Sequence, residues 1–250
     1  MSYLQVAKQA AKEAGDFLKE NFHQEKQVNE TSQFDIKIEL DVITQKKIED
    51  IILASYPEHA ILGEEGCAGL EGSDFEWIVD PIDGTVNYYY GIPHFCVSIA
   101  LREKGELVLG VIYDPMVDEL WYAEKGGPAY LNDRVITVSN RTQMAEAVLF
   151  VGHGKTGSSL ETGVERFGRI SKQVRKMRIT GSAALACVYV ASGRFDAYVE
   201  SRISIWDIAA GFVILEAALG SVELGDIPEG DENSFSIVAW NGKIPIKEHI

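Results

Sequence analysis

The sequence predicts a mixed α/β fold, α/β in its second half and α+β in its first, in which helices alternate with two groups of strands. Apolar residues recur with helical spacing up to Tyr56, short β-rich runs follow one another between residues 95 and 131, and helical and strand-like segments alternate from residue 147 onward. No internal repeat or linker interrupts the chain. We therefore expect a single domain over residues 1–250, with an antiparallel half at 1–145 and an α/β half at 146–250.

Two helices are predicted at the start of the chain. The first covers residues 4–22, and the second runs from about Asp41 to Tyr56, where Pro57 ends it. Short strands are then expected at 95–101, 107–113, 120–123 and 129–131. Lys104-Gly105 and Asn132-Asp133 have the composition of hairpin turns between such strands. This order predicts an antiparallel meander.

The second half predicts helices and strands in alternation. A buried strand at 147–151 precedes a helix over about 160–176, a strand near 176–180 and a helix over 183–192. A strand at 195–200, an apolar helix over 207–218 and a strand at 221–224 complete the pattern. Such alternation is typical of α/β proteins.

The charge and cysteine content limit the partners that we expect. The net charge of −15 repels nucleic acids and anionic membrane surfaces, although bound cations would still allow this chain to bind phosphate. Three widely spaced cysteines and no Cys-x-x-Cys pair make a disulfide framework or a structural zinc site improbable. Charges throughout the first twenty residues exclude a signal peptide, and no run is long and apolar enough to span a bilayer. We therefore expect a soluble cytoplasmic protein.

Carboxylates follow apolar runs at three places in the chain. In WIVDPIDGT, residues 77–85, Asp80 and Asp83 end such a run, Glu64-Glu65 follow another, and Asp207 follows Trp206. A tight turn, a solvated loop and a helix N-terminus would each explain one of these features alone. Together they favour one site for Mg²⁺, because this ion prefers carboxylate oxygens and would relieve the repulsion between the acids.

Three motifs carry a family resemblance. GEEG (63–66), WIVDPIDGT (77–85) and WDIAAG (206–211) resemble, in order and spacing, the signatures of the inositol monophosphatase family. The resemblance covers essentially the whole chain. It implies a layered α-β-α-β-α sandwich, a homodimer, and a Mg²⁺-dependent, lithium-sensitive phosphomonoesterase that acts on a small phosphorylated metabolite.

The substrate implied by this resemblance is a small polyol or sugar phosphate, with inositol 1-monophosphate as the first candidate. Fructose 1,6-bisphosphate, histidinol phosphate, glycerol phosphate and nucleoside phosphates remain alternatives on the same site, because any phosphate monoester can bind to a Mg²⁺ cluster. A catalytically inactive binding protein is disfavoured, since the presumed metal ligands and Thr85 are all present.

The resemblance also implies a set of metal ligands. Glu64, Asp80 and the carbonyl oxygen of Ile82 would hold a first Mg²⁺ ion. Asp80, Asp83 and Asp207 would hold a second, and Glu64 with water molecules would hold a weaker third. One ion would activate a water molecule while another stabilises the leaving oxygen.

Further residues would position the water and the substrate. Thr85, paired with Asp41, would orient the attacking water, with Glu64 and Asp83 as the other catalytic residues. The backbone of Asp83, Gly84 and Thr85 would bind the phosphate at the start of a helix. The substrate's remaining atoms would contact Gly181, Ser182, Ala183, Glu200 and Asp207.

The chain departs from the family pattern before Asp41. The usual threonine-containing VTxxD-type segment reads Ile-Lys-Ile-Glu-Leu-Asp at residues 36–41, so Lys37 and Glu39 add charges beside the expected third-metal loop. Ser204 stands where some animal members have histidine, and Leu219-Gly220 replaces the usual Gly-Gly.

Residues 152–157 suggest a different class of function. They form Gly-x-Gly-x-x-Gly between a predicted strand and a predicted helix, as in dinucleotide-binding proteins. The acid expected about twenty residues later is missing, but Arg175, Lys176 and Arg178 would suit NADP, so an NADP-binding oxidoreductase is the alternative. On the phosphatase interpretation, we expect His153 and Lys155 to border the substrate pocket.

Overall fold

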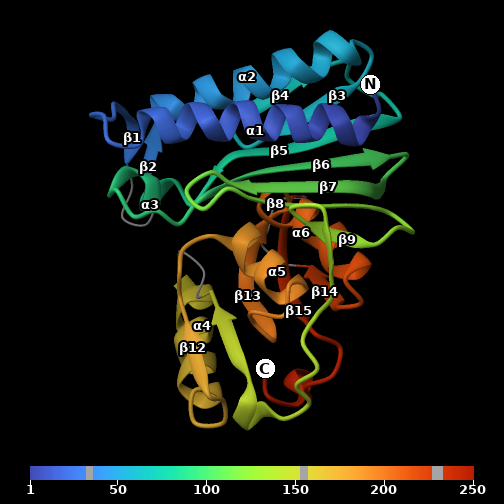
Figure 1. Ribbon diagram of the computed structural model, residues 1–250. Coiled ribbons are helices and arrows are strands. Elements are labelled where there is room, and N and C mark those ends of the chain that lie inside the picture. Colours follow the sequence, from blue (N-terminus) through green and yellow to red (C-terminus); the bar gives the residue numbers. More distant parts are fainter. Residues whose placement is uncertain (32–35, 153–156, 227–232) are drawn as a thin grey trace.

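Five layers of helix and sheet build the protein, in the order α-β-α-β-α, as the computed structural model in Figure 1 shows from top to bottom. The structure describes residues 1–31, 36–152, 157–226 and 233–250. The layered sandwich implied by the family resemblance is therefore confirmed. Three apolar cores lie between successive layers.

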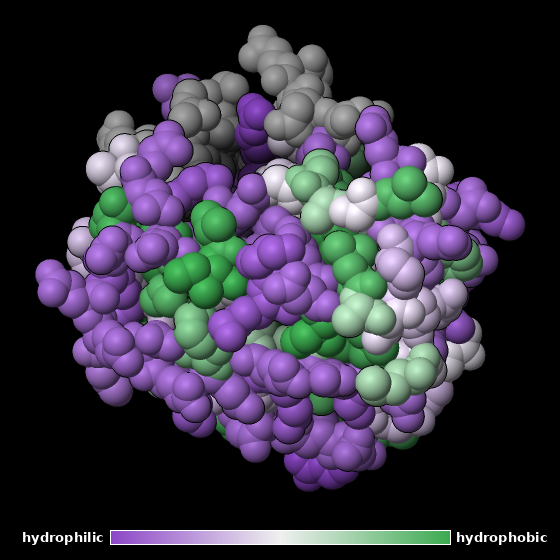
Figure 2. All heavy atoms as spheres, turned by 90° about the horizontal axis from the view of Figure 1, so that it is seen from above, coloured by the Kyte–Doolittle hydropathy of each residue, from purple (hydrophilic) through white to green (hydrophobic). Residues whose placement is uncertain are grey.

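Helices α1 (Tyr3–Asn21) and α2 (Glu39–Ser55) form the first layer. Ser2 and Gln5 cap α1 reciprocally. The Ser2 hydroxyl accepts from the Gln5 backbone N–H, and the side-chain oxygen Oε1 of Gln5 accepts from the Ser2 backbone N–H. Small buried residues let α1 lie close to the sheet, and Gly15 lies directly against the Tyr113 ring. The outward side of this helical layer is mostly hydrophilic (Figure 2), as expected for amphipathic helices.

The second layer is an eight-stranded sheet with the order β10-β9-β8-β7-β6-β5-β3-β4. Its strands are β3 (Ala60–Gly63), β4 (Gly66–Gly69), β5 (Phe75–Asp83), β6 (Cys96–Glu103), β7 (Glu106–Asp114), β8 (Glu119–Glu124), β9 (Ala129–Leu131) and β10 (Arg134–Ile136). The pairings from β5 to β10 are antiparallel, which confirms the predicted meander, whereas β3 pairs with β5 in parallel. Both predicted hairpin turns are present, with positive φ at all four of their central residues.

The third layer consists of α5 (Ala183–Ala191) and α6 (Ile205–Ala217), which lie between the two large sheets. The fourth is a five-stranded sheet with the order β12-β11-β13-β15-β14. Its strands are β11 (Val148–Val151), β12 (Lys176–Arg178), β13 (Ala197–Ser204), β14 (Ser221–Asp226) and β15 (Ser234–Trp240). Helix α4 (Gly157–Ile170) covers its outer face as the fifth layer (Figure 1).

Smaller elements complete the chain. Strands β1 (Val28–Thr31) and β2 (Ile36–Ile38) form an antiparallel pair just before α2, and the short helix α3 (Thr85–Tyr89) follows β5. Two 3₁₀ turns occupy Met144–Glu146 and Ile246–Glu248.

Some predicted boundaries were wrong. The helix expected over 160–176 begins at Gly157 and ends at Ile170, because Ile170 is its last fully buried apolar residue and the polar segment after it forms a turn. The strand expected at 195–200 runs from Ala197 to Ser204, since β15 continues to pair with it beyond a bulge. The sequence analysis did not expect β15 or the β1–β2 pair.

Helix α6 lies unusually close to the eight-stranded sheet. Ala100, Gly110 and Ala123 are neighbours on three adjacent strands and are all small. A Cβ atom added to Gly110 would lie 2.3 Å from the carbonyl oxygen of Ala210 on α6. On the other side of α6, a Cβ on Gly211 would lie 2.5 Å from the Cβ of Cys187. The small residues of the WDIAAG motif therefore allow α6 to fit between the sheet and α5.

We expect Gly110→Ala to destabilise the protein by about 1–3 kcal/mol, because the added methyl group forces α6 away from β7. Urea denaturation would measure this change. Gly168→Ala is the control: Gly168 lies on α4 with no atom within 4 Å of an added Cβ. It should leave stability unchanged or raise it by up to about 1 kcal/mol. Equal stability of Gly110→Ala and the wild type would contradict the packing argument.

Candidate active site

A β-bulge at the end of β5 places Asp80 and Asp83 on the same face of the sheet. Asp80 pairs with Ser98 of β6 and Asp83 with Cys96, so three steps along β5 match two along β6. In a regular strand, residues three apart point to opposite faces. The extra residue in β5 shifts the alternation by one, so that both side chains point to the same face. Pro81, which has no N–H to donate, lies within the bulge. The segment from Asp80 to Asp83, whose composition is also that of a tight turn, is therefore a bulged strand end.

The three aspartates of the site are each held by backbone N–H groups. The Asp80 Oδ1 atom accepts from the Ile82 N–H at 2.9 Å, which also stabilises the bulge. The Asp207 Oδ2 atom accepts from the Ser204 N–H at 3.0 Å and so caps the start of α6. Thus Asp207 is both the helix-terminal acid of the simpler interpretation and a member of the acidic cluster.

Asp83 receives more hydrogen bonds than the other two. Its carboxylate accepts from the N–H groups of Ala183 at 3.2 Å and Ala184 at 2.7 Å, at the N-terminus of α5, and from the Ser182 hydroxyl. Cys96 Sγ lies 3.7 Å from the same carboxylate. These contacts join β5 of the first sheet to α5 of the middle layer.

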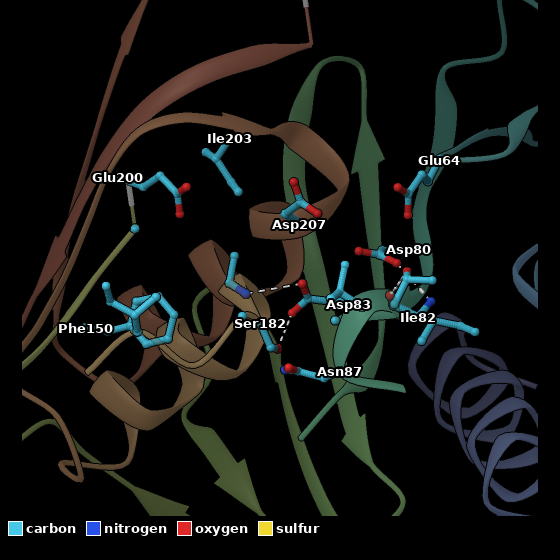
Figure 3. Close-up of a pocket in the computed structure, with 17 residues that line it drawn as sticks. Glu64, Asp80, Ile82, Asp83, Asn87, Phe150, Ser182, Glu200, Ile203 and Asp207 are labelled. Atoms are coloured by element: carbon cyan, nitrogen blue, oxygen red, sulfur yellow. Dashed lines mark hydrogen bonds between the residues drawn. The ribbon is translucent and has the colours of Figure 1, made fainter. Parts of the chain in front are cut away.

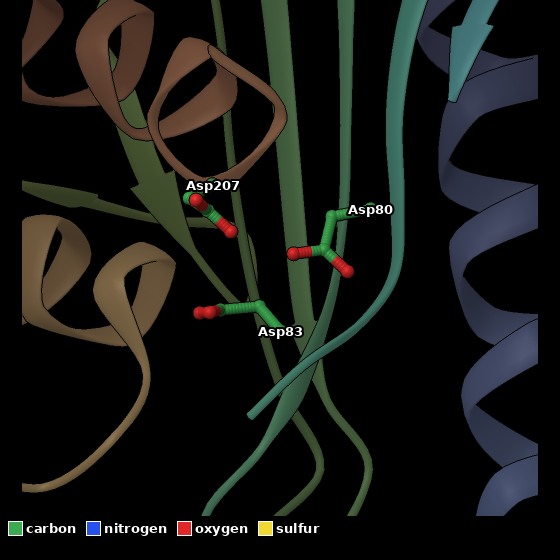
Figure 4. A group of neighbouring side chains, drawn as sticks. All are labelled: Asp80, Asp83 and Asp207. Carbon is green, nitrogen blue, oxygen red and sulfur yellow. The ribbon is translucent and has the colours of Figure 1, made fainter. Parts of the chain in front are cut away.

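The three carboxylates converge on one point. Asp80, Asp83 and Asp207 each offer an oxygen, and these oxygens lie within 4.8 Å of one another (Figure 4). Burial, together with the charges of Glu64, Asp83 and Asp207, raises the pKa of Asp80 well above its usual value of 3.8. Burial also raises the pKa of Asp83, although its hydrogen bonds act in the opposite direction.

The donor chemistry of this cluster fits Mg²⁺. Carboxylate oxygens are the ligands this ion prefers, and a divalent cation would remove the repulsion that raises these pKa values. Ile82 also lines the cavity, and its carbonyl oxygen accepts from the Thr85 hydroxyl at 2.9 Å and keeps a second lone pair.

A cavity of about 290 Å³ surrounds the cluster. Glu64 and Asp80 lie at one end, and Glu200 and Phe150 at the other (Figure 3). Of the predicted metal, catalytic and substrate-binding residues, all but Asp41 line it; the lining consists of Glu64, Asp80, Ile82, Asp83, Gly84, Thr85, Val86, Asn87, Phe150, Gly152, Ile179, Gly181, Ser182, Ala183, Glu200, Ile203 and Asp207. The structure therefore brings these residues together around one cavity, whose apolar lining the sequence did not predict.

Asp41 does not line this cavity, but its carboxyl group interacts with the charge of Glu64, which does. The Asp41 Oδ2 atom accepts from the Ile38 N–H at 2.8 Å, whereas the buried Oδ1 atom has no hydrogen-bond partner among the residues that the structure describes. Burial and the charges of Glu64 and Glu65 raise the pKa of Asp41 to about 8. Asp41 and Thr85 share no hydrogen bond in the described residues, so the expected pairing between them stays a prediction.

Glycines allow close approach at the far end of the cavity. A Cβ on Gly152 would lie 1.9 Å from a carboxylate oxygen of Glu200, so any side chain at this position would displace the Glu200 carboxylate. Glu200 also accepts from the Tyr198 hydroxyl at 2.6 Å. Gly181 has φ +81°, and a Cβ there would meet the Asn87 amide, which donates to the Thr180 and His94 carbonyl oxygens.

The first glycine of the 152–157 motif therefore contacts a carboxylate. A negative charge here is a poor neighbour for the pyrophosphate that such a loop binds in dinucleotide-binding proteins. His153 and Lys155, expected to border the pocket, lie outside the described residues.

Comparisons with known proteins identify relatives of the whole chain. The sequence model of the inositol monophosphatase family matches residues 1–245. A Thermotoga maritima protein named fructose-1,6-bisphosphatase/inositol-1-monophosphatase is 42% identical over 81% of this chain and 75% of its own. An inositol-1-monophosphatase from Mesorhizobium japonicum is 40% identical over 95% and 91% of the two chains.

The fold has close structural neighbours as well. The crystal structure of the extragenic suppressor protein SuhB from Bartonella henselae superposes with a TM-score of 0.89. It is 35% identical in sequence, and the match covers 95% of this chain and 93% of the other. Within the described residues, no helix has the length and apolar character needed to cross a membrane.

We expect the metal-free protein to lose stability as the pH rises from about 5 to 8. A carboxyl group with a raised folded-state pKa stabilises the fold at pH values below its unfolded pKa, and this contribution is lost as the pH rises through the folded pKa. For Asp41 these values are 3.8 and about 8. Thermal unfolding in EDTA would measure the slope, which Asp41→Asn should reduce.

The exposed Asp133, whose pKa is lowered, supplies the control, and Asp133→Asn should keep the wild-type slope over this range. Stability in EDTA that rises between pH 5 and 8 would contradict this prediction.

Proposed function

The chain belongs to the inositol monophosphatase family and is a phosphatase, and we propose that it hydrolyses a small polyol or sugar phosphate with the help of Mg²⁺. The observation that carries this proposal is the convergence of Asp80, Asp83 and Asp207, from two parts of the chain, in a cavity. Inositol 1-monophosphate is the first candidate substrate, since the Mesorhizobium relative bears that activity in its name. The oxidoreductase alternative is not retained.

The carboxylates would hold Mg²⁺ from both sides of the cavity. Asp80, Asp83 and Asp207 would form one site, and Glu64, Asp80 and the Ile82 carbonyl oxygen a second. Such ions supply Lewis acidity: they polarise the phosphate and lower the pKa of a bound water molecule. The protein's own contribution is to fix the ligands, because each aspartate of the cluster is hydrogen-bonded to a backbone N–H.

Thr85 would orient the attacking water molecule, and Asp41 would accept a proton from it. Thr85 lines the cavity beside the Ile82 carbonyl, and its hydroxyl oxygen can accept a hydrogen bond from water while it donates to that carbonyl. Within the described parts of the chain the Asp41 Oδ1 atom has no hydrogen-bond partner, and the pKa of this carboxyl group is raised to about 8. Both properties suit Asp41 as a proton acceptor near neutral pH. Glu64 and Asp83 complete the proposed catalytic set.

The phosphate would bind at the start of α3. Gly84 has φ +103° and precedes the first helical residue, Thr85, and both residues line the cavity, where N–H groups at a helix start would favour an anion. The substrate's hydroxyl groups would reach Glu200 and the segment from Gly181 to Ala183. Ser182 would act there mainly through Asp83, to which its hydroxyl donates.

A nucleoside monophosphate is a second candidate, favoured by the apolar lining of the cavity. Val86, Phe150, Ile179 and Ile203 contribute this lining, and a polyol with hydroxyl groups on every carbon leaves it unused. A flat base or a ring with an apolar face would bury it instead. Fructose 1,6-bisphosphate stays an alternative because the Thermotoga relative carries both activities in its name.

Two further properties belong to the same proposal. We expect a homodimer, which analytical ultracentrifugation would test, and inhibition by Li⁺. We also expect a cytoplasmic enzyme that binds neither nucleic acid nor membranes, in keeping with the net charge of −15.

Phosphate release from inositol 1-monophosphate should require Mg²⁺, stop in EDTA and decrease in Li⁺. The assay should include fructose 1,6-bisphosphate, histidinol phosphate, glycerol phosphate and a nucleoside monophosphate, because each carries the same phosphate on a different alcohol. The highest kcat/KM identifies the substrate class. A nucleoside monophosphate in first place would favour the apolar lining as the specificity determinant, and no release from any ester would contradict the proposal.

Asp83→Asn and Asp207→Asn should each lower kcat by at least about a hundredfold, because even residues that only support metal ligands contribute 10- to 100-fold. Circular dichroism should show that both variants stay folded. Asp50→Asn is the control, since Asp50 lies on the exposed side of α2 and pairs only with Lys46 in the described residues. Near-normal turnover in either cluster variant would refute the metal assignment.

A further inference from the structure

A lysine lies beside the acidic turn that contributes Glu64 to the cavity. Lys37, on β2, places its Nζ atom 3.3 Å from both carboxylate oxygens of Glu65. The Glu65 side chain is 9% exposed and that of Lys37 is 40% exposed. The ion pair therefore lies at the boundary between the acidic cluster and solvent, immediately next to Glu64.

The position of this ion pair is set by α2. Gln45 accepts from the Glu65 N–H at 2.9 Å and donates to the Gly66 carbonyl oxygen at 3.0 Å. A Cβ on Gly63 would lie 2.3 Å from the same glutamine side chain. Strand β2 leads directly into α2, so Lys37 and the acidic turn are attached to one helix. The distance between ammonium and carboxylates is thus fixed by secondary structure.

The ammonium group interacts with more than its direct partner. Burial lowers the pKa of Lys37, but the charges of Glu65, Glu64 and Asp41 raise it above its usual value, so the group stays protonated. Conversely, Lys37 lowers the pKa of Asp41, which Glu64 and Glu65 raise. Lys37 is therefore a cation within the field of the acids where a further Mg²⁺ ion would be held.

We propose that Lys37 replaces the weakest Mg²⁺ ion on the Glu64 side of the cavity, so that this chain binds two divalent ions rather than three. The inference rests on the proposed metal-dependent function. An ion held by one carboxylate and water molecules is the most easily displaced, and a fixed ammonium both repels it and neutralises its ligands. Lys37 lies in the segment Ile-Lys-Ile-Glu-Leu-Asp at residues 36–41, which leads directly into α2.

Titration calorimetry of the EDTA-stripped full-length protein with Mg²⁺ tests the proposal. The wild type should bind two ions per chain, and Lys37→Gln should bind an additional, weaker ion. Lys37→Arg keeps the charge and should behave as the wild type does. Lys46→Gln is the matched control. Lys46 lies on α2 and pairs with Glu49 and Asp50, and its substitution changes the net charge by the same amount as Lys37→Gln.

Thermal unfolding gives a second, independent readout. In EDTA, the unfolding midpoint of Lys37→Gln should lie below that of Lys46→Gln, because the acids near residue 37 lose the cation that neutralises them. Added Mg²⁺ should then raise the midpoint of Lys37→Gln by more than that of Lys46→Gln. Equal stoichiometry in the wild type and Lys37→Gln, or three ions in the wild type, would overturn the inference but leave Mg²⁺ dependence intact. Absence of Mg²⁺ binding to the wild type would instead overturn the proposed function as well.

Discussion

The geometry of the site depends on one extra residue in β5. Without the bulge between Asp80 and Asp83, the alternation of side chains would send one carboxylate toward α1 and α2 and the other toward α5 and α6. With it, Ile82 packs with Val79 in the core beneath α1 and α2, while both aspartates face the middle layer. The proline in the bulge has no N–H to leave unpaired, which makes this interruption of the ladder tolerable.

The second constraint is the close packing of α6 between the sheet and α5. Gly110 and Gly211 leave no space for a side chain, so the N-terminus of α6 is brought down to the ends of β5 and β6. Asp207 in its first turn then meets the two aspartates of β5. The price is electrostatic, because buried carboxylates repel one another and take up protons when no cation is present. Metal binding and stability are coupled for this reason.

Most of the fold could be predicted from the sequence, and so could the residues that converge at the acidic cluster. Hydrophobic periodicity located the helices and the meander, and the acidic motifs named the carboxylates that the structure brings together, because local chemistry is visible in local sequence. The bulge was misread as a turn, since Asp, Pro and Gly are common to both and only the pairing with β6 distinguishes them. The apolar lining from Phe150, Ile179 and Ile203 was not anticipated either, because each residue looks like ordinary core or surface until tertiary structure brings it to the cavity.

The hydrogen bonds of the acids separate two kinds of carboxylate in this site. Asp80, Asp83 and Asp207 are tied to backbone N–H groups, so their orientation is fixed before any ion arrives and little reorganisation is needed on binding. Asp41 is different: one oxygen accepts from the Ile38 N–H, and the other is buried with no hydrogen-bond partner in the portion of the chain that the structure describes. Burying such an oxygen atom is unfavourable unless it forms a hydrogen bond with a neighbouring group or a water molecule. The three aspartates with fixed orientation are suited to hold ions rigidly. The Asp41 oxygen, which lacks a hydrogen bond, is suited to interact with a water molecule that loses its proton beside those ions.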